Sequence, residues 1–257
     1  MRVSVGPATA QNTGHGNDTL AGIENLFGSS FDDELSGNSS ANYLHGFDGG
    51  NDLLEGMGGD DVLEVQRSSS SGAAAITMLG GGGSDILRYT GNGASDSATL
   101  SGGGGSSDTI EATGLLNGTI TTSSGNDRAS IDTMVGQYVI TMGSGGDVLA
   151  LQSTGGGFRA VNAINLTDFD PAEGDRIDLS AWIAGGALQN YTRGNPFLTG
   201  HLQLAQAGPH TLLQVDRDGG SDNFVTLLTF QNVTATAFTA ASLGGFPPHV
   251  EGQGPLD

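Results

Sequence analysis

Aspartates at a nine-residue spacing, set among glycines, are the residues best suited to chemistry in this sequence. Asp52 and Asp61 are nine residues apart, each followed two residues later by a leucine, and Asp33 and Asn42 repeat that spacing upstream. Carboxylates and main-chain carbonyls are hard oxygen ligands, and Ca²⁺ takes about 6–8 of them at about 2.3–2.6 Å. One aspartate per nine residues supplies too few ligands, so calcium binding requires neighbouring loops to share each ion.

The surrounding glycines explain how main-chain carbonyls would converge on an ion. Glycine reaches positive φ at little steric cost, so a glycine-rich loop can turn successive carbonyls inward. Residues 56–64 read GMGGDDVLE, which matches GGxGxDxUx with Met57 in place of one glycine and U a large apolar residue. The same core recurs downstream at aspartates separated by 23, 19 and 20 residues. We predict metal ligands at Asp18, Asp33, Asp52, Asp61, Asp85, Asp108, Asp127, Asp147, Gly14, Gly16, Gly50, Gly56, Gly58, Gly59, Gly81, Gly83, Gly103, Gly105, Gly143 and Gly145, with Asp175 and Asp178 closing a terminal site.

Turn formation without metal is the alternative for each aspartate, because Gly-Asp and Asn-Asp pairs make turns on their own. For one isolated loop we favour that alternative, whereas an array in a nine-residue frame favours metal binding. Both interpretations stay open for Asp32 and Asp96. We expect Asp48 and Asp60 to be solvated, and Asn42 to fill a loop position without strong ligation.

Short strands must hold these loops in register. The residues D-x-U form a strand whose side chains alternate, so U points inward. Two nonapeptides make one coil, and several coils must stack because one coil cannot bury its own apolar face. We predict an all-β parallel β-roll (β-solenoid) over residues 1–152, with regular nonapeptides at 13–64 and longer irregular coils at 65–152. Its expected core comprises Leu20, Leu35, Leu44, Leu54, Leu63, Leu87, Ile110 and Leu149.

This nonapeptide frame resembles the RTX (repeats-in-toxin) family of type I-secreted bacterial proteins. Residues 18–33, DTLAGIENLFGSSFDD, are similar to the segment that opens many RTX blocks. The resemblance implies a parallel β-roll covering residues 13–152. Without Ca²⁺ the aspartates would form rows of like charge, so we predict that the chain is largely unfolded until several Ca²⁺ ions bind.

The composition changes after about residue 153, and we assign residues 153–257 to a β-rich C-terminal cap. Apolar runs at 211–215 and 224–230 flank the acidic turn 216–222, which indicates a β-hairpin. That turn binds a further ion in one interpretation and none in the other. We expect the tail after Gly244 to be disordered.

The order FDPxxGDxIDLS, then a DxDG turn, then VTLxxFxNV, resembles the C-terminal type I secretion target region of RTX proteins over about residues 160–245. The resemblance implies an uncleaved C-terminal export signal and the type I secretion machinery as a partner. The first residues lack the apolar stretch of a signal peptide. We therefore expect a secreted, extracellular chain, in one version associated with the cell surface.

Composition limits the other partners. The chain has 45 glycines, 28 acidic residues against 8 basic ones, all of them arginine, a net charge of −20 and no cysteine. A charge of this size opposes compaction unless cations neutralise it. Nucleic acid and anionic lipid require basic patches, so we expect neither as a partner. No apolar run reaches 18 residues, so we expect no transmembrane segment.

Catalysis is not expected, because the sequence lacks HExxH, GxSxG, the Walker loop and a GxGxxG that opens a helix. We hold two hypotheses for the role. One is an extracellular structural or adhesive protein of a biofilm matrix or surface layer that forms homo-oligomers or fibres. The other is the calcium-binding folding and secretion module of a larger RTX enzyme or toxin, such as a protease, lipase or alginate epimerase. Halophile adaptation would not generate a nine-residue frame, so we discount it.

Overall fold

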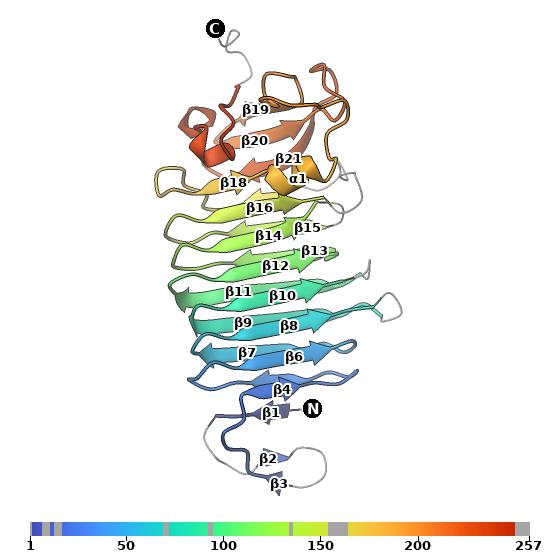
Figure 1. Cartoon of the computed structure of the whole chain (residues 1–257), viewed down its shortest axis with the longest axis vertical. Helices are drawn as coiled ribbons and strands as arrows, with labels where there is room; N and C mark the ends of the chain where they lie inside the picture. Colours follow the sequence, from blue (N-terminus) through green and yellow to red (C-terminus); the bar gives the residue numbers. More distant parts are fainter. Residues whose placement is uncertain are drawn as a thin grey trace.

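A computed structural model of the chain shows an elongated stack of coils that rises from the N-terminal end to a C-terminal cap (Figure 1). Each coil contributes one short strand to each of two parallel sheets, which face each other across a narrow apolar interior. The chain is therefore a β-solenoid, as predicted. The structure describes residues 2–6, 11–12, 17–68, 72–91, 95–133, 136–153 and 164–249.

Successive strands of the solenoid alternate between the two long sheets. The larger sheet has the order β1 (Arg2–Ser4), β5 (Glu34–Ser36), β7 (Leu53–Gly58), β9 (Ala75–Gly83), β11 (Ser97–Gly105), β13 (Asn117–Thr121), β15 (Gln137–Thr141), β17 (Ile164–Leu166), β21 (Val225–Phe230), β20 (His210–Val215) and β19 (Leu202–Ala207). The eight-stranded sheet has the order β18 (Arg176–Asp178), β16 (Val148–Gln152), β14 (Arg128–Asp132), β12 (Thr109–Thr113), β10 (Ile86–Thr90), β8 (Val62–Gln66), β6 (Tyr43–Phe47) and β4 (Asn25–Phe27).

Alternation along each strand produces the core. In β8 and β10 every second side chain is buried, as expected when one face of a strand packs inward. The register stacks like on like, for example Leu63 on Leu87 and Leu87 on Ile110. All predicted core positions except Leu20 are fully buried, namely Leu35, Leu44, Leu54, Leu63, Leu87, Ile110 and Leu149. Leu20 is only partly buried against this core.

The C-terminal segment continues the stack rather than forming a separate body. β17 and β18 extend the two sheets past residue 152, and β21 then pairs in parallel with β17. β20 pairs antiparallel with both β21 and β19, which confirms the predicted hairpin around the acidic turn. The helix α1 (Ser180–Ala184) contacts β16, and its buried Trp182 indole donates a hydrogen bond to Thr133 Oγ1 at 2.9 Å. The 3₁₀ turns η1 (Ala235–Ala237) and η2 (Ala241–Leu243) complete the cap.

The first predicted repeat differs from the others. β2 (Gln11–Asn12) pairs antiparallel with β3 (Asn17–Asp18), so Asp18 lies outside both parallel sheets. The predicted ligands Gly14 and Gly16 fall outside the described residues. The regular stack begins at β4 and β5. In the described part of the chain, no helix is long and apolar enough to cross a membrane.

A candidate cation-binding column

Six aspartates occupy equivalent places at one corner of the solenoid. Each immediately precedes a strand of the eight-stranded sheet, so the parallel register stacks them one above another. We call this set the aspartate column, and it comprises Asp61, Asp85, Asp108, Asp127, Asp147 and Asp175. All six are buried.

One oxygen of each carboxylate links two coils. The backbone N–H of Asp61 donates to Asp85 Oδ1 at 2.8 Å, and the N–H of Asp85 donates to Asp108 Oδ1 at 2.8 Å. The same bond joins Asp108 to Asp127 at 2.6 Å and Asp127 to Asp147 at 2.7 Å. Each aspartate therefore satisfies the amide of the preceding coil, which fixes the vertical spacing of the corner.

The second oxygen has no such role. Oδ2 of Asp61, Asp85, Asp108, Asp127 and Asp147 is buried and has no hydrogen-bond partner. A buried charged oxygen that lacks a partner is costly, because it has lost its water without gaining an interaction. The column therefore presents a row of carboxylate oxygens that require a proton or a cation.

A glycine carbonyl approaches two of these oxygens from the next coil. A Cβ atom built on Gly56 would lie 2.3 Å from Asp61 Oδ2 and 2.5 Å from the Gly80 carbonyl oxygen. A Cβ on Gly80 would lie 2.4 Å from Asp85 Oδ2 and 2.5 Å from the Gly102 carbonyl oxygen. Carboxylate and carbonyl oxygens of successive coils thus converge beside each glycine, which is the donor set that a hard cation such as Ca²⁺ prefers.

Sequence reasoning identified only one glycine of this kind, Gly56. Five further glycines approach the side-chain oxygen of an Asp or Asn that follows five or six positions later, a signal that the repeat contained: Gly28, Gly37, Gly46, Gly80 and Gly102. In later coils Thr122 and Met142 stand five residues before Asp127 and Asp147, and both are buried. The glycine-lined part of the column is therefore its N-terminal half.

Most of the predicted glycines are needed for their backbone conformation or for a close approach between coils instead. Gly59 and Gly81 have φ of 94° and 110°, values that favour glycine. Gly105 approaches the preceding coil so closely that a Cβ would lie 1.7 Å from the Gly83 carbonyl oxygen, whereas around Gly58 nothing lies nearer than 3.7 Å. The other predicted glycines with positive φ are Gly50, Gly83, Gly103, Gly143 and Gly145.

Burial changes the acidity of the column. The pKa of Asp61 is raised to about 6, chiefly by loss of solvent; the backbone N–H of Asn42 opposes the rise, and the neighbouring carboxylate of Asp85 adds to it. Burial likewise raises the pKa of Asp108 and of Asp147 to about 6. It also raises the pKa values of Asp85, Asp127 and Asp175. All these shifts have the same cause, an anion that lacks both water and a counterion.

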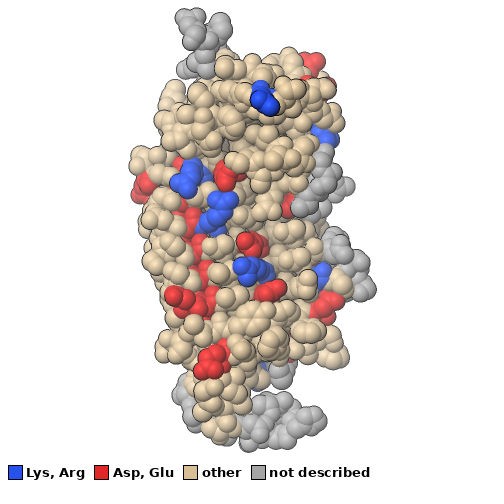
Figure 2. Space-filling view, in the orientation of Figure 1, with Lys and Arg blue, Asp and Glu red and all other residues tan. Residues whose placement is uncertain are grey.

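Arginines do not supply that counterion within the described residues. The ion pairs formed there join Arg2 to Glu34, Arg67 to Asp96, Arg88 to Glu111 and Arg128 to Asp178, and none includes a member of the column. Figure 2 shows acidic side chains along the length of the solenoid and basic ones at only a few positions. The charge of the column is left for small cations or protons to neutralise.

The larger sheet carries a shorter version of the corner. Asp33 and Asp52 precede β5 and β7, and the Asp33 N–H donates to Asp52 Oδ1 at 3.1 Å. Asp52 Oδ2 is buried without a hydrogen-bond partner, and burial raises the pKa of Asp52 to about 7. Asp33 Oδ2 instead accepts from the Ser29 hydroxyl at 3.0 Å. Asp52 thus resembles the column, while Asp33 is held by its own loop.

Asp96, left open by the sequence, is paired with protein groups. Its carboxylate contacts the Arg67 guanidinium at 3.2 Å and accepts hydrogen bonds from the Tyr89 hydroxyl at 2.5 Å and the Ala74 N–H at 2.8 Å. Arg67 and Asp96 are both buried. Here an arginine from 29 residues upstream neutralises the buried carboxylate.

The column ends at Asp175, whose two oxygens accept from the Asp147 N–H at 2.9 Å and the Asp170 N–H at 2.8 Å. Asp178 lies apart from it. Its oxygens accept from the Ser180 N–H at 3.0 Å and from Arg128 at 3.0 Å. Although partial burial acts to raise the pKa of Asp178, these bonds lower it overall.

The remaining acidic residues of the loops bind amides of the following coil. Asp32 Oδ1 accepts from the Asn51 N–H at 2.7 Å, and Asp60 Oδ1 accepts from the Ser84 N–H at 2.8 Å. Asp48 Oδ1 accepts from the Ser68 N–H at 2.9 Å. These three hold successive turns together, a role that sequence reasoning did not foresee.

Comparisons with known proteins are sparse. No family model matches the chain, and no curated protein matches it. Among solved structures, the chain is similar to the extracellular lipase LipA from Serratia marcescens, with 12% sequence identity and a TM-score of 0.27 over 93% of this chain and 42% of that one. The chain thus spans less than half the length of that lipase. The functional assignment rests on the residues of the column.

Proposed function

We propose that this chain is a calcium-binding β-solenoid of the RTX kind, which folds when Ca²⁺ neutralises the aspartate column. The proposed function is binding, and we assign it no catalytic step. The observation that carries the proposal is the row of buried Oδ2 atoms without hydrogen-bond partners, at Asp61, Asp85, Asp108, Asp127 and Asp147.

The chemistry of the corner selects the type of ion. Asp61 Oδ2 with the Gly80 carbonyl, and Asp85 Oδ2 with the Gly102 carbonyl, provide oxygen donors only. Soft metals prefer thiolate and imidazole ligands, while carboxylate and carbonyl groups suit Ca²⁺. Ca²⁺ also tolerates irregular coordination, which suits coils of unequal length. We therefore assign Ca²⁺ to these positions, with Asp52 as the corresponding residue on the larger sheet.

The energetic argument is one of linkage. An ion that binds only the folded chain stabilises it by about 4 kcal/mol per site at 1,000 times its Kd. Typical domains are stable by about 5–15 kcal/mol in total, so a few sites suffice to decide between the folded and unfolded states. Without the ions, the column combines unpartnered oxygens with repulsion between like charges.

Removal of calcium provides the direct test. We expect circular dichroism of the chain in EGTA to show little strand, and addition of Ca²⁺ at neutral pH to restore a strand-rich spectrum. Mg²⁺ at the same concentration serves as the control for ionic strength and charge. A chelated chain with the full strand signal, or no heat in a calcium titration of chelated protein, would contradict the proposal.

Calcium dependence also suggests a cellular role. We propose that the chain leaves the cell unfolded through type I secretion, and that it folds outside, where Ca²⁺ is abundant, as a structural or adhesive protein. Comparing export of the whole chain with that of a chain ending at residue 159 tests the route, and equal export of both would contradict it. Sedimentation in millimolar Ca²⁺ tests assembly, because a structural role predicts oligomers that chelator dissolves, whereas a strict monomer would count against it.

A further inference from the structure

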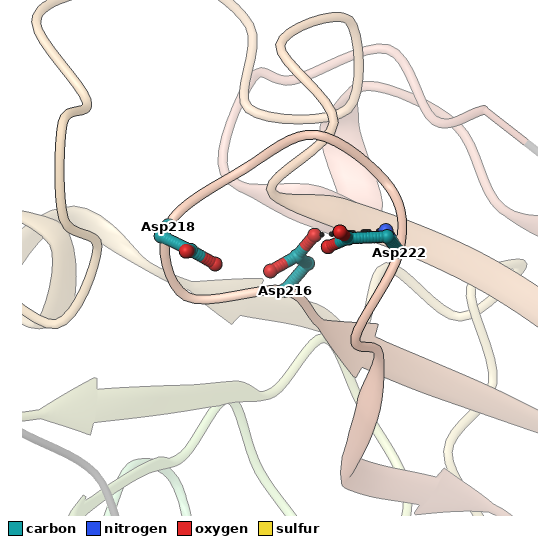
Figure 3. Close-up of side chains that lie close together, drawn as sticks. All are labelled: Asp216, Asp218 and Asp222. Atoms are coloured by element: carbon teal, nitrogen blue, oxygen red, sulfur yellow. Dashed lines mark hydrogen bonds between the residues drawn. The ribbon is translucent and has the colours of Figure 1, made fainter.

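The turn between β20 and β21 brings three acidic side chains together, far along the chain from the column. One carboxylate oxygen from each of Asp216, Asp218 and Asp222 lies within 4.8 Å of the other two. Figure 3 shows Asp216 between the other two, with the carboxylate of Asp218 directed toward it. We call these three residues the turn triad.

Asp216 distinguishes this turn from an ordinary acidic loop. Its side chain is fully buried at the end of β20, while Asp218 and Asp222 are exposed. Asp216 Oδ2 accepts from the Asp222 N–H at 3.1 Å. Asp216 Oδ1 is buried and has no hydrogen-bond partner. An oxygen in that state, facing two further carboxylates, calls for a positive charge within the turn.

Main-chain and ring contacts of the cap also hold the turn in place. The Asp216 N–H donates to the His201 carbonyl at 2.9 Å, and the Gln189 N–H donates to the Arg217 carbonyl at 2.7 Å. Gly219 packs over the His201 ring so closely that a Cβ would lie 2.8 Å from it. The three carboxylates are therefore gathered by the cap itself.

We propose that the turn triad binds one hard divalent cation, with Ca²⁺ the best fit, independently of the solenoid. Ligands on opposite sides of a Ca²⁺ ion are about 4.6–5.2 Å apart, given Ca–O distances of about 2.3–2.6 Å. The triad oxygens fall within that limit. Ca²⁺ tolerates irregular oxygen coordination, whereas Mg²⁺ requires near-ideal octahedral geometry, so an exposed turn of three carboxylates favours Ca²⁺. Asp216 supplies the buried oxygen, Asp218 and Asp222 close the site from the solvent side, and water completes the coordination.

Equilibrium dialysis of the whole chain with ⁴⁵Ca²⁺ tests this site. Because Asp218 is exposed, Asp218→Asn should leave the fold intact, which circular dichroism in Ca²⁺ would verify. We expect Asp218→Asn to bind one ion fewer than the unaltered chain. The matched control is Glu24→Gln, which removes one exposed charge far from the turn and should bind the full number.

A column variant, Asp85→Asn, separates this proposal from the proposed function. If Asp85→Asn loses an ion while Asp218→Asn binds the full number, the turn site is refuted and the column stands. If the unaltered chain binds a single ion that only Asp218→Asn loses, the turn site stands and the column does not. If Asp218→Asn and Glu24→Gln lose the same amount of bound calcium, the turn site is also refuted, because the loss would then follow from the change in net charge alone.

Discussion

In five of the six column aspartates the two oxygens have different surroundings, and only Asp175 uses both to accept amides. In Asp61, Asp85, Asp108, Asp127 and Asp147, Oδ1 accepts an amide from the preceding coil and Oδ2 is buried without a hydrogen-bond partner. Asn42 occupies the same kind of loop without a charge. Its Oδ1 accepts from the Asn38 N–H at 2.7 Å, so the side chain is used within its own loop. Turn formation therefore does not require the charge, which under the proposed function serves ligand binding.

Met57 provides a residue-scale prediction. Its φ of 77° is one that side chains with a Cβ adopt only at a cost, and its side chain is largely exposed. We expect Met57→Gly to stabilise the calcium-loaded chain by about 0.5–1 kcal/mol, because strain relief outweighs the added backbone entropy of the unfolded state. Thermal unfolding in Ca²⁺ measures this change.

The matched control for Met57 is Gly81, which pairs with it in the register and has a φ of 110°. Gly81→Ala should destabilise the chain, because its Cβ would lie 2.3 Å from the Met57 carbonyl oxygen. If Met57→Gly and Gly81→Ala both lower the melting temperature, the positive φ of Met57 is not a source of strain.

The nine-residue frame predicted aspartates at equivalent positions of successive coils, and the structure places six of them at one corner. It did not single out the glycines beside them. The sequence argument looked for glycines that adopt positive φ, as Gly59 and Gly81 do. Gly80 and Gly102 have no positive φ, but a Cβ at either position would overlap the carboxylate five or six residues downstream, and at Gly80 also the Gly102 carbonyl oxygen. Contacts between coils are set by the register, which one chain segment cannot reveal.

At the scale of the elements, the glycine positions in the strands beside the column determine whether carboxylate and carbonyl oxygens of successive coils can converge. Gly80 lies in β9, where a Cβ would overlap both Asp85 Oδ2 and the Gly102 carbonyl oxygen. We expect Gly80→Ala to weaken calcium binding and to lower the melting temperature in Ca²⁺ by several degrees. Calorimetric titration and thermal unfolding measure the two effects.

Gly104→Ala is the control for Gly80→Ala, since nothing lies within 4 Å of a Cβ at that position in the adjacent strand β11. It should bind calcium as the unaltered chain does. Normal binding by Gly80→Ala would show that ions do not sit beside the glycine-lined corner.

The pH dependence belongs to the same corner. The pKa values of Asp61, Asp108 and Asp147 are raised to about 6 by burial and that of Asp52 to about 7, above the ordinary value near 4. A raised pKa means that the folded chain holds protons more tightly than the unfolded chain. Stability of the chelated chain should therefore be greatest near pH 4 and should fall as the pH rises to about 7.

Circular dichroism of the calcium-stripped chain in calcium-free buffer between pH 4 and pH 8 measures this trend, because the strand signal should be greatest near pH 4 and lost toward pH 8. Because Ca²⁺ competes with those protons, the stabilisation that it provides should increase over the same range. The calcium-saturated chain at each pH is the reference. The same strand signal at pH 5 and pH 8 in the absence of calcium would contradict the assignment of buried carboxylates with raised pKa values.

At the scale of the whole molecule, repeats predicted the solenoid, but pairing between distant segments had to come from the structure. Arg67 and Asp96, 29 residues apart, form a buried ion pair that links two segments of the solenoid. The cap pairs β21 with β17, residues that nothing in the local sequence connects. Such contacts depend on the number of residues in each loop. Because the coils differ in length, the sequence alone does not show which distant residues face each other.

Truncation distinguishes the two ends. We expect a chain lacking residues 1–22 to keep its calcium-induced strand signal, because it loses only the terminal strand β1 from the two long sheets and none of the column aspartates. A chain lacking residues 164–257 should lose it, because Asp147 would lack the carboxylate of Asp175 and the last coil would lose its cover. Circular dichroism with and without Ca²⁺ measures both, and equal behaviour of the two truncations would contradict this polarity.

The one-way hydrogen bonds of the column imply an order of assembly. Along the column, the N–H of each aspartate from Asp61 to Asp147 donates to the carboxylate of the next coil in the chain, whereas the Asp175 N–H donates within its own segment, to the Asp170 carbonyl at 3.3 Å. We therefore expect the coil of Asp175 to become ordered first and the earlier coils to follow toward the N-terminus. Because residue 175 is synthesised after the other members of the column, a nascent chain cannot begin this ordering until that residue has left the ribosome.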